Sequence, residues 1–250
     1  MPQFTKIENK HLIISILILT FVFAFNDKSS SFYLPFWLLN FIKILIIITF
    51  SLLFKEIIKK YWAEKYGAVS EYRIWNIQRY YLRTKSKFPF KIPIGIILPL
   101  LITIFSLGRL FFPITSESSI TYSKIKRAGR KWAHLPHWEE GKISIMGPLA
   151  SLIIVFIFKI LSYITSFSFQ NVIFINSLLA VFYMLPFPQL EGGKVFIGSK
   201  TYYILCLMFI LLSVFLINII GILETIILSG ILALLITLLY FYKVELGGKV

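Results

Sequence analysis

One short segment of an otherwise apolar chain contains lysines and a glutamate at a spacing that could bring them to a common site. Residues 54–68 read FKEIIKKYWAEKYGA and place Lys55 and Lys59 four positions apart, with Glu56 beside the first lysine. Residues at i and i+4 share one face of a helix, so these three side chains could act on one centre. Taken alone, the segment also fits the basic end of a membrane span, with Glu56 and Lys60 as an i,i+4 pair.

A second polar segment lies at residues 176–196, which read NSLLAVFYMLPFPQLEGGKVF. Pro186 and Pro188 end a helix and free its carbonyl groups. The acidic residue Glu191 precedes a pair of glycines. Irregular backbone at membrane depth must line protein or a cavity, so this segment is expected to border a site.

Other candidate residues have simpler explanations. His134 and His137 stand close to two glutamates and could form a metal cluster, but the neighbouring tryptophans favour an interfacial anchoring loop at 134–140. Lys43 and Lys159 lie inside apolar runs. They could mark a polar pathway, but their long side chains can also reach the headgroups.

The composition indicates a polytopic membrane protein. The chain has 250 residues, of which 58% are hydrophobic and 17% aromatic, and its mean hydropathy is +0.82. The net charge of +15 is explained by basic residues at a cytoplasmic face, and no nucleic-acid-binding module is visible. One cysteine, Cys206, cannot form a disulfide within the chain.

The apolar runs predict the membrane spans. Runs long enough to cross ~30 Å of hydrocarbon occur at 11–26, 35–54, 145–165, 170–190, 201–220 and 222–243. The first run contains VFA at 22–24, which resembles a signal-peptide cleavage site. We interpret this run as an uncleaved span because its basic flank fits the orientation that the other loops give.

Basic residues predict the orientation. They crowd the segments 55–91 and 113–142, which are separated by an apolar run at 92–112 that prolines, glycines and Arg109 interrupt. A full crossing by this run would place the two basic segments on opposite sides, against the positive-inside tendency. We therefore predict six crossings and one re-entrant segment, with both termini in the cytoplasm.

Together these segments resemble the site-2 protease family of intramembrane zinc metalloproteases. That family reads His-Glu-x-x-His, then a Gly-Pro span start, then Asn-x-x-Pro-x-Pro-x-Leu-Asp-Gly. The resemblance covers residues 35–200, and 92–112 is similar to the family's membrane-associated hairpin. The positions that keep the pattern are Ala63, Gly67, Gly147, Pro148, Asn176, Pro186, Pro188, Leu190, Gly192 and Gly193.

The departures from this pattern fall on the family's chemistry. Lysines stand at both histidine positions, Glu191 at the aspartate position and Tyr183 at that of the asparagine nearest the prolines, while Glu56 keeps the base position. Deprotonating a lysine at pH 7 costs about 4.6 kcal/mol from its reference pKa. Two lysines would offset most of the ~10–16 kcal/mol of a structural zinc site. The resemblance thus implies a vestigial site formed by Lys55, Glu56, Lys59, Tyr183 and Glu191, without metal.

The charges suggest what replaces the metal. Lys55 and Lys59 balance Glu56 and Glu191, as zinc balances two carboxylates in the family. We predict a lysine–glutamate cluster that joins the second span to the Pro-x-Pro segment. In the alternative, both lysines reach the cytoplasmic headgroups.

The sequence therefore predicts an all-α polytopic membrane protein. Its parts are an N-terminal span with an outer loop at 1–34, a site-2-protease-like core at 35–200 and a C-terminal two-helix hairpin at 201–250. The expected function is that of a catalytically inactive relative without cofactor, in the cell membrane, which binds or regulates membrane-protein clients or associates with an active relative. The alternative is an active metalloprotease with an atypical zinc site.

Overall fold

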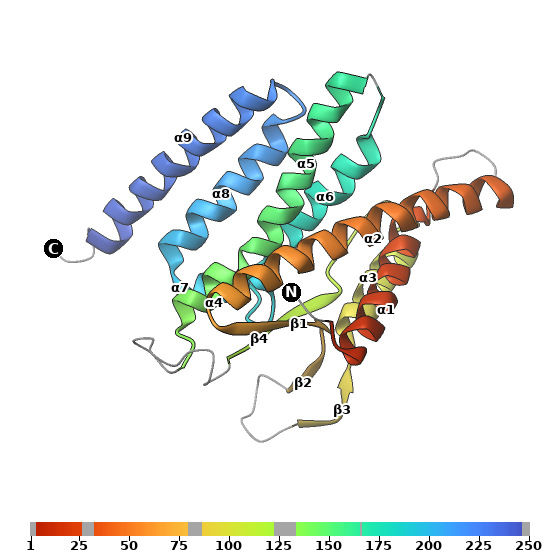
Figure 1. Cartoon of the computed structure of the whole chain (residues 1–250), viewed down its shortest axis with the longest axis horizontal. Helices are drawn as coiled ribbons and strands as arrows, with labels where there is room; N and C mark the ends of the chain where they lie inside the picture. Colours follow the sequence, from red (N-terminus) through yellow and green to blue (C-terminus); the bar gives the residue numbers. More distant parts are fainter. Residues whose placement is uncertain (1–3, 27–32, 80–86, 123–133, 166, 247–250) are drawn as a thin grey trace.

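The computed structural model describes residues 4–26, 33–79, 87–122, 134–165 and 167–246. Helices dominate it (Figure 1). The helices are α1 (Lys6–Ala24), α2 (Leu34–Lys65), α3 (Ile94–Phe105), α4 (His137–Ser144), α5 (Met146–Thr165), α6 (Gln170–Phe182), α7 (Glu191–Gly198), α8 (Lys200–Leu216), α9 (Ile222–Tyr240) and a π-helical turn (Phe241–Leu246). The strands are β1 (Ala68–Ile74), β2 (Ile77–Arg79), β3 (Lys87–Ile92) and β4 (Ser116–Tyr122).

Four helical stretches in the described part of the chain are long and apolar enough to cross a membrane. They are Lys6–Ala24, Leu34–Lys65, His137–Thr165 and Ile222–Val244. The runs predicted at 170–190 and 201–220 form the shorter apolar helices α6 and α8, of 13 and 17 residues. Helix α6 ends at Phe182, four residues before Pro186, because the prolines cannot continue the helical hydrogen bonds.

The chain is mostly helical, as predicted, but four short strands add a small β component that the all-α prediction lacked. β1 pairs with β4 in antiparallel register from Ala68↔Tyr122 to Ile74↔Ser116, and β2 pairs with β3. Every second residue of β1 is buried from Ala68 onward, which is the alternation of a strand with one face on the core. The two sheets lie at the base of the helices (Figure 1).

The segment 92–112 leaves the sheet region and comes back to it. α3 has 12 residues and is therefore about 18 Å long, shorter than the ~30 Å of a hydrocarbon core. The chain turns after α3 at Leu107 and Gly108, which have positive φ angles of 52° and 72°. At the start of α3, Gly95 donates to Trp75 O, and a Cβ at Gly95 would lie 2.2 Å from Thr115 O. The two ends of this segment therefore meet beside the end of β1.

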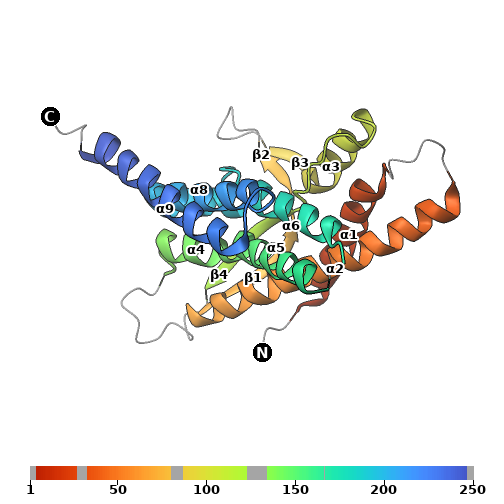
Figure 2. The ribbon, with the colours of Figure 1, turned by 90° about the horizontal axis from the view of Figure 1, so that it is seen from above.

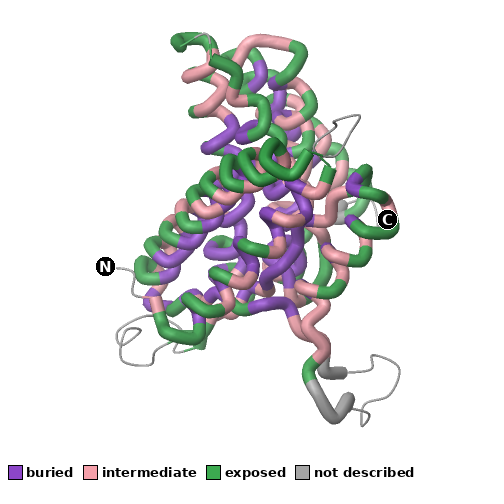
Figure 3. Tube along the Cα trace, turned by 90° about the vertical axis from the view of Figure 1, so that its right-hand side faces the viewer, coloured by how far each residue is buried: buried purple, intermediate pink, exposed green. Residues whose placement is uncertain are grey.

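The buried core lies where α1, α2, α5 and α6 meet above the sheet. One cluster joins Leu12 and Leu19 of α1 to Ile48 and Leu52 of α2 and to Leu179 of α6. Figure 3 shows the buried residues gathered at the centre of the molecule, below exposed helix ends. Seen from above, the α8–α9 pair and the α1–α3 region lie on opposite sides of α5 and α6 (Figure 2).

Candidate functional site: a buried lysine–glutamate cluster

The lower part of α2 turns three charged side chains into the core. Lys55, Glu56 and Lys59 are each at most 1% exposed. They lie within one turn of a 32-residue helix, so their side chains project toward the same neighbours. Glu191, the first residue of α7, is also 1% exposed and faces them.

The four charges form one connected cluster. Lys59 Nζ donates to Glu191 Oε1 at 3.0 Å and to Glu56 Oε1 at 3.1 Å. Lys55 Nζ lies 3.3 Å from the same Glu191 oxygen. The structure thus forms the predicted pairing of Lys55 and Lys59 with Glu191, which links α2 to the start of α7. Because two lysines balance two glutamates, the cluster carries no net formal charge.

Tyr183 and strand β4 close the cluster on one side. Lys55 Nζ lies 3.0 Å from the centroid of the Tyr183 ring, a cation–π contact. The Tyr183 hydroxyl lies 3.0 Å from Ser116 Oγ on β4, and either oxygen could be the donor. Tyr183 is 1% exposed, so its ring packs against Lys55 instead of bordering an open cavity.

The loop between α6 and α7 fixes the position of Glu191. The Gly192 N–H donates to Tyr183 O at 2.9 Å, and the Tyr203 hydroxyl donates to Met184 O at 2.9 Å, so carbonyls at the end of α6 are satisfied. A Cβ at Gly192 or Gly193 would lie 2.2 Å from Met184 O or 1.9 Å from Phe187 O. Both glycines are therefore required by close backbone packing. An acidic residue in the first turn of α7 is also favoured by the helix dipole.

The Gly-Pro segment makes room for the carboxylate. A Cβ at Gly147 would lie 2.4 Å from Glu191 Oε2. Gly147 and Pro148 are buried in the first turn of α5, where proline is tolerated. The absence of a side chain at Gly147 is therefore what lets Glu191 reach α2.

The remaining pattern residues shape the surroundings of the cluster. Asn176 of α6 donates to Ser51 Oγ of α2 at 2.9 Å. Gly67 ends α2 with a φ angle of 68°, in the left-handed region that glycine favours. Ala63 and Leu190 are buried core residues, at 1% and 0% exposure. Each of these residues therefore has a packing or hydrogen-bonding role in the fold around the cluster.

The donor set does not fit zinc. Lysine binds a metal only as the neutral amine, but Lys55 and Lys59 lie at ion-pair distance from the carboxylate of Glu191, an arrangement that suits ammonium groups. In the described part of the chain, no three His, Cys, Asp or Glu side chains come together as a metal site. His134 instead contacts the Tyr122 hydroxyl, while His137 Nδ1 lies 3.5 Å from Glu140 Oε2.

The structure also contains a second buried ion pair, which the sequence did not predict. Lys60 lies 2.9 Å from the carboxylate of Glu8 in α1 and donates to Ser70 O at 3.0 Å. Glu8 also accepts a hydrogen bond from the Tyr72 N–H at 2.9 Å. Glu56, which the i,i+4 rule paired with Lys60, accepts instead from Lys59. The polar first turn of α1, with Glu8 three residues after the N-cap Thr5, was the only sequence signal for this site.

Fold and site together define a helical membrane protein with a charge cluster buried between α2 and the start of α7. A curated protein of Methanocaldococcus jannaschii, named "Putative zinc metalloprotease MJ0611", is 30% identical over 203 residues, which cover 77% of this chain and 85% of that protein. The chain belongs to the metalloprotease-like family of this archaeal protein. No family model and no solved structure matches it.

Proposed function

We propose that this protein is a non-catalytic member of its family, with a site-2-protease-like core, that binds membrane-protein clients. The observation that carries the proposal is the buried cluster of Lys55, Lys59 and Glu191, with ion-pair distances of 3.0–3.3 Å. These three residues stand where the site-2 protease pattern has its metal ligands. Side chains held as mutual counter-ions are not available to coordinate an ion and activate a water.

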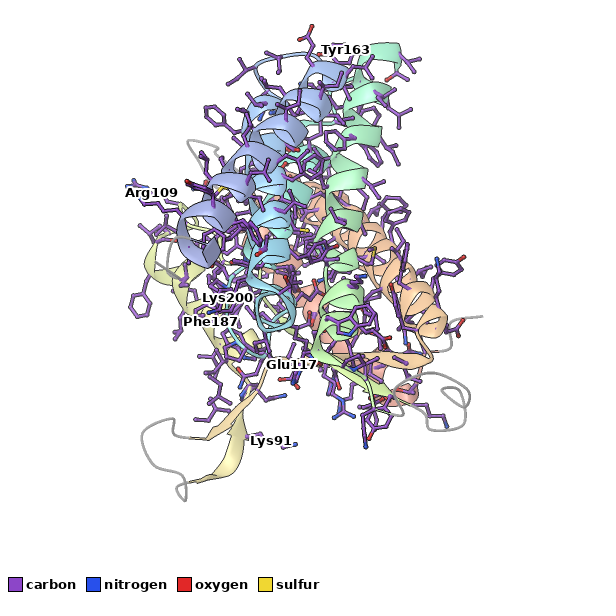
Figure 4. All side chains as sticks on the ribbon, turned by 90° about the vertical axis from the view of Figure 1, so that its left-hand side faces the viewer. Lys91, Arg109, Glu117, Tyr163, Phe187 and Lys200 are labelled. Carbon is purple, nitrogen blue, oxygen red and sulfur yellow. The ribbon has the colours of Figure 1, made fainter. Side chains whose placement is uncertain are left out.

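The return of 92–112 toward the sheet supports the topology proposed with this function. In that topology α3 enters the membrane and comes back, six other segments cross it, and both termini face the cytoplasm. Lys91 and Tyr163 lie toward opposite ends of the molecule (Figure 4), consistent with a basic inner face and an outer face near the α5–α6 connection.

Client binding is tested by site-specific photocrosslinking in native membranes. A photoreactive residue replaces Ile57, which is 45% exposed on α2 beside the cluster, and in a control replaces Ile164, which is 74% exposed at the far end of α5. We expect adducts with membrane-spanning segments of a small, reproducible set of proteins at position 57. Identical adducts at both positions would contradict client binding, because they would reflect only the abundance of the neighbouring membrane proteins.

The name of the archaeal relative favours a second candidate, an active metalloprotease with an atypical site. A cleavage assay separates the two candidates. The purified protein is incubated in vesicles with a model single-span substrate, with and without added zinc. We expect no cleavage in either case, whereas zinc-dependent cleavage that Glu56→Gln abolishes would establish the second candidate.

A further inference from the structure

A pocket of about 700 Å³ lies away from the lysine–glutamate cluster, between α2, the end of α5 and the start of α6. Aromatic rings form much of its wall. The ring of Phe158 meets those of Phe50 and Phe169 edge to face, at centroid distances of 6.1 and 5.3 Å, and Phe167 contacts Phe169 at 5.0 Å. The volume falls in the range of pockets that bind small molecules.

One charged residue, Lys43, lines this apolar pocket. It lies about 14 Å along α2 from the start of the helix, within a stretch that can cross a membrane. Among the described residues, no carboxylate pairs with its ammonium group and no acceptor takes a hydrogen bond from it. Lys159, which lies inside α5, contacts the Tyr163 ring at 5.8 Å. A cation at this depth is costly unless it meets an anion or water, so Lys43 is suited to an anionic ligand.

The start of α6 adds further donors at the same end of the pocket. α6 begins at Gln170, and its N-cap residue Phe169 supplies no side-chain acceptor to the N–H groups of the first turn. The pocket lining includes Ser168, Gln170 and Asn171 beside Lys43. First-turn N–H groups and the helix dipole favour negative charge, as the lysine does.

We propose that this pocket binds an anionic phospholipid. The headgroup phosphate would lie between Lys43 and the first turn of α6, and one acyl chain would run along Phe50 and Phe158. Two residues of the pocket lining, Ile46 and Phe50, are 63% and 47% exposed on α2, so an acyl chain can enter the pocket from the surface of this helix. Charge complementarity selects this occupant, because an apolar helix of another protein would leave Lys43 unpaired and a zwitterionic lipid brings its own cation.

The test uses the purified full-length protein, delipidated in detergent and titrated with phosphatidylglycerol or with phosphatidylcholine of the same acyl chains. Native mass spectrometry counts the bound lipids and gives both dissociation constants. We expect the anionic lipid to bind about tenfold more tightly, a difference of ~1.4 kcal/mol. Lys43→Gln should remove this preference, and the matched variant Lys159→Gln should keep it.

A second variant tests the acyl-chain part of the pocket. Ile46→Trp places a larger side chain on the pocket wall and should weaken binding of both lipids while elution stays monodisperse. Equal affinity of the wild type for the two lipids would overturn the proposal, as would an equal effect of Lys43→Gln and Lys159→Gln. Displacement of phosphatidylglycerol by excess glycerol phosphate would show a site for a soluble anion and would also overturn it.

Discussion

At the level of single residues, the stability of the protein should depend most on the buried lysine–glutamate cluster. Its four charged side chains, Lys55, Glu56, Lys59 and Glu191, are at most 1% exposed. A buried ion pair gives little net stability compared with apolar residues, but the loss of one partner leaves an uncompensated charge in a low-dielectric surrounding. Replacing either lysine should therefore destabilise the protein most when Glu191 is present.

We predict that Lys59→Met destabilises the protein by about 3–5 kcal/mol, because it leaves Glu56 and Glu191 without their shared partner. Glu191→Gln in the same chain should restore part of this loss, with a coupling above ~1 kcal/mol. The coupling is measured by denaturant titration of the wild type, the two single variants and the double variant in mixed micelles. Lys142→Met, at an exposed position on α4, is the control and should change stability by less than ~0.5 kcal/mol. Additive effects of the two cluster substitutions would show that the residues do not interact.

A steric prediction concerns Gly147. Gly147→Ala should destabilise the protein by about 1–3 kcal/mol, since the added Cβ would meet Glu191 Oε2. Glu191→Ala in the same chain should relieve the steric part of this loss. Gly230→Ala is the matched control, because no atom lies within 4 Å of the added Cβ there. It should be neutral or stabilising by up to ~1 kcal/mol. Equal losses at Gly147 and Gly230 would contradict this packing.

At the scale of elements, a second ion pair fastens α1 to α2 and β1. Lys60→Met should destabilise the protein by about 3–5 kcal/mol, because Glu8 would remain buried without its cation. Glu8→Gln in that background should recover part of the loss, since glutamine still accepts from the Tyr72 N–H. The exposed Arg73–Glu71 pair, at 2.8 Å, is the control, and Arg73→Met should cost less than ~1 kcal/mol. Comparable losses at the buried and exposed pairs would refute the role of Lys60.

The apolar runs predicted six of the helices, although only four helical stretches in the described part of the chain are long enough to cross a membrane. The strands were not predicted because the alternation of β1 lies in a basic segment that was interpreted by its charge, although Ala68, Ser70, Tyr72 and Ile74 are buried in turn. The partner of β1 is β4, more than 40 residues further along, so no local pattern could show the pairing.

For the site, the order of the motifs predicted that Lys55 and Lys59 lie close to Glu191, which is more than 130 residues further along the chain. The resemblance supplied this link, since no helical period connects α2 to α7. The partner of Lys60 could not be predicted in the same way. Consecutive helical residues point about 100° apart, so Lys60 faces α1 while Lys59 faces α7, and only the packing of α1 reveals Glu8 as the partner.

At the scale of the whole molecule, the proposed orientation can be tested by cysteine labelling. Single cysteines replace Lys91, Lys142 and Phe167, which are exposed, in a Cys206→Ser background. A membrane-impermeant maleimide should label positions 91 and 142 from one side and position 167 from the other, because the chain returns after α3 to the end of β1, where it left. Labelling of 91 and 142 from opposite sides would rule out a re-entrant α3.

If ion pairs take the place of a metal in the buried cluster, the purified protein should contain little zinc. Elemental analysis compares the wild type with the variant Lys55→His/Lys59→His/Glu191→Asp, both purified without chelator. We predict a wild type far below one zinc per chain and a variant that binds more, because neutral imidazoles can coordinate where ammonium groups cannot. A wild type with one zinc per chain, lost on Lys55→Met or Glu191→Gln, would contradict it.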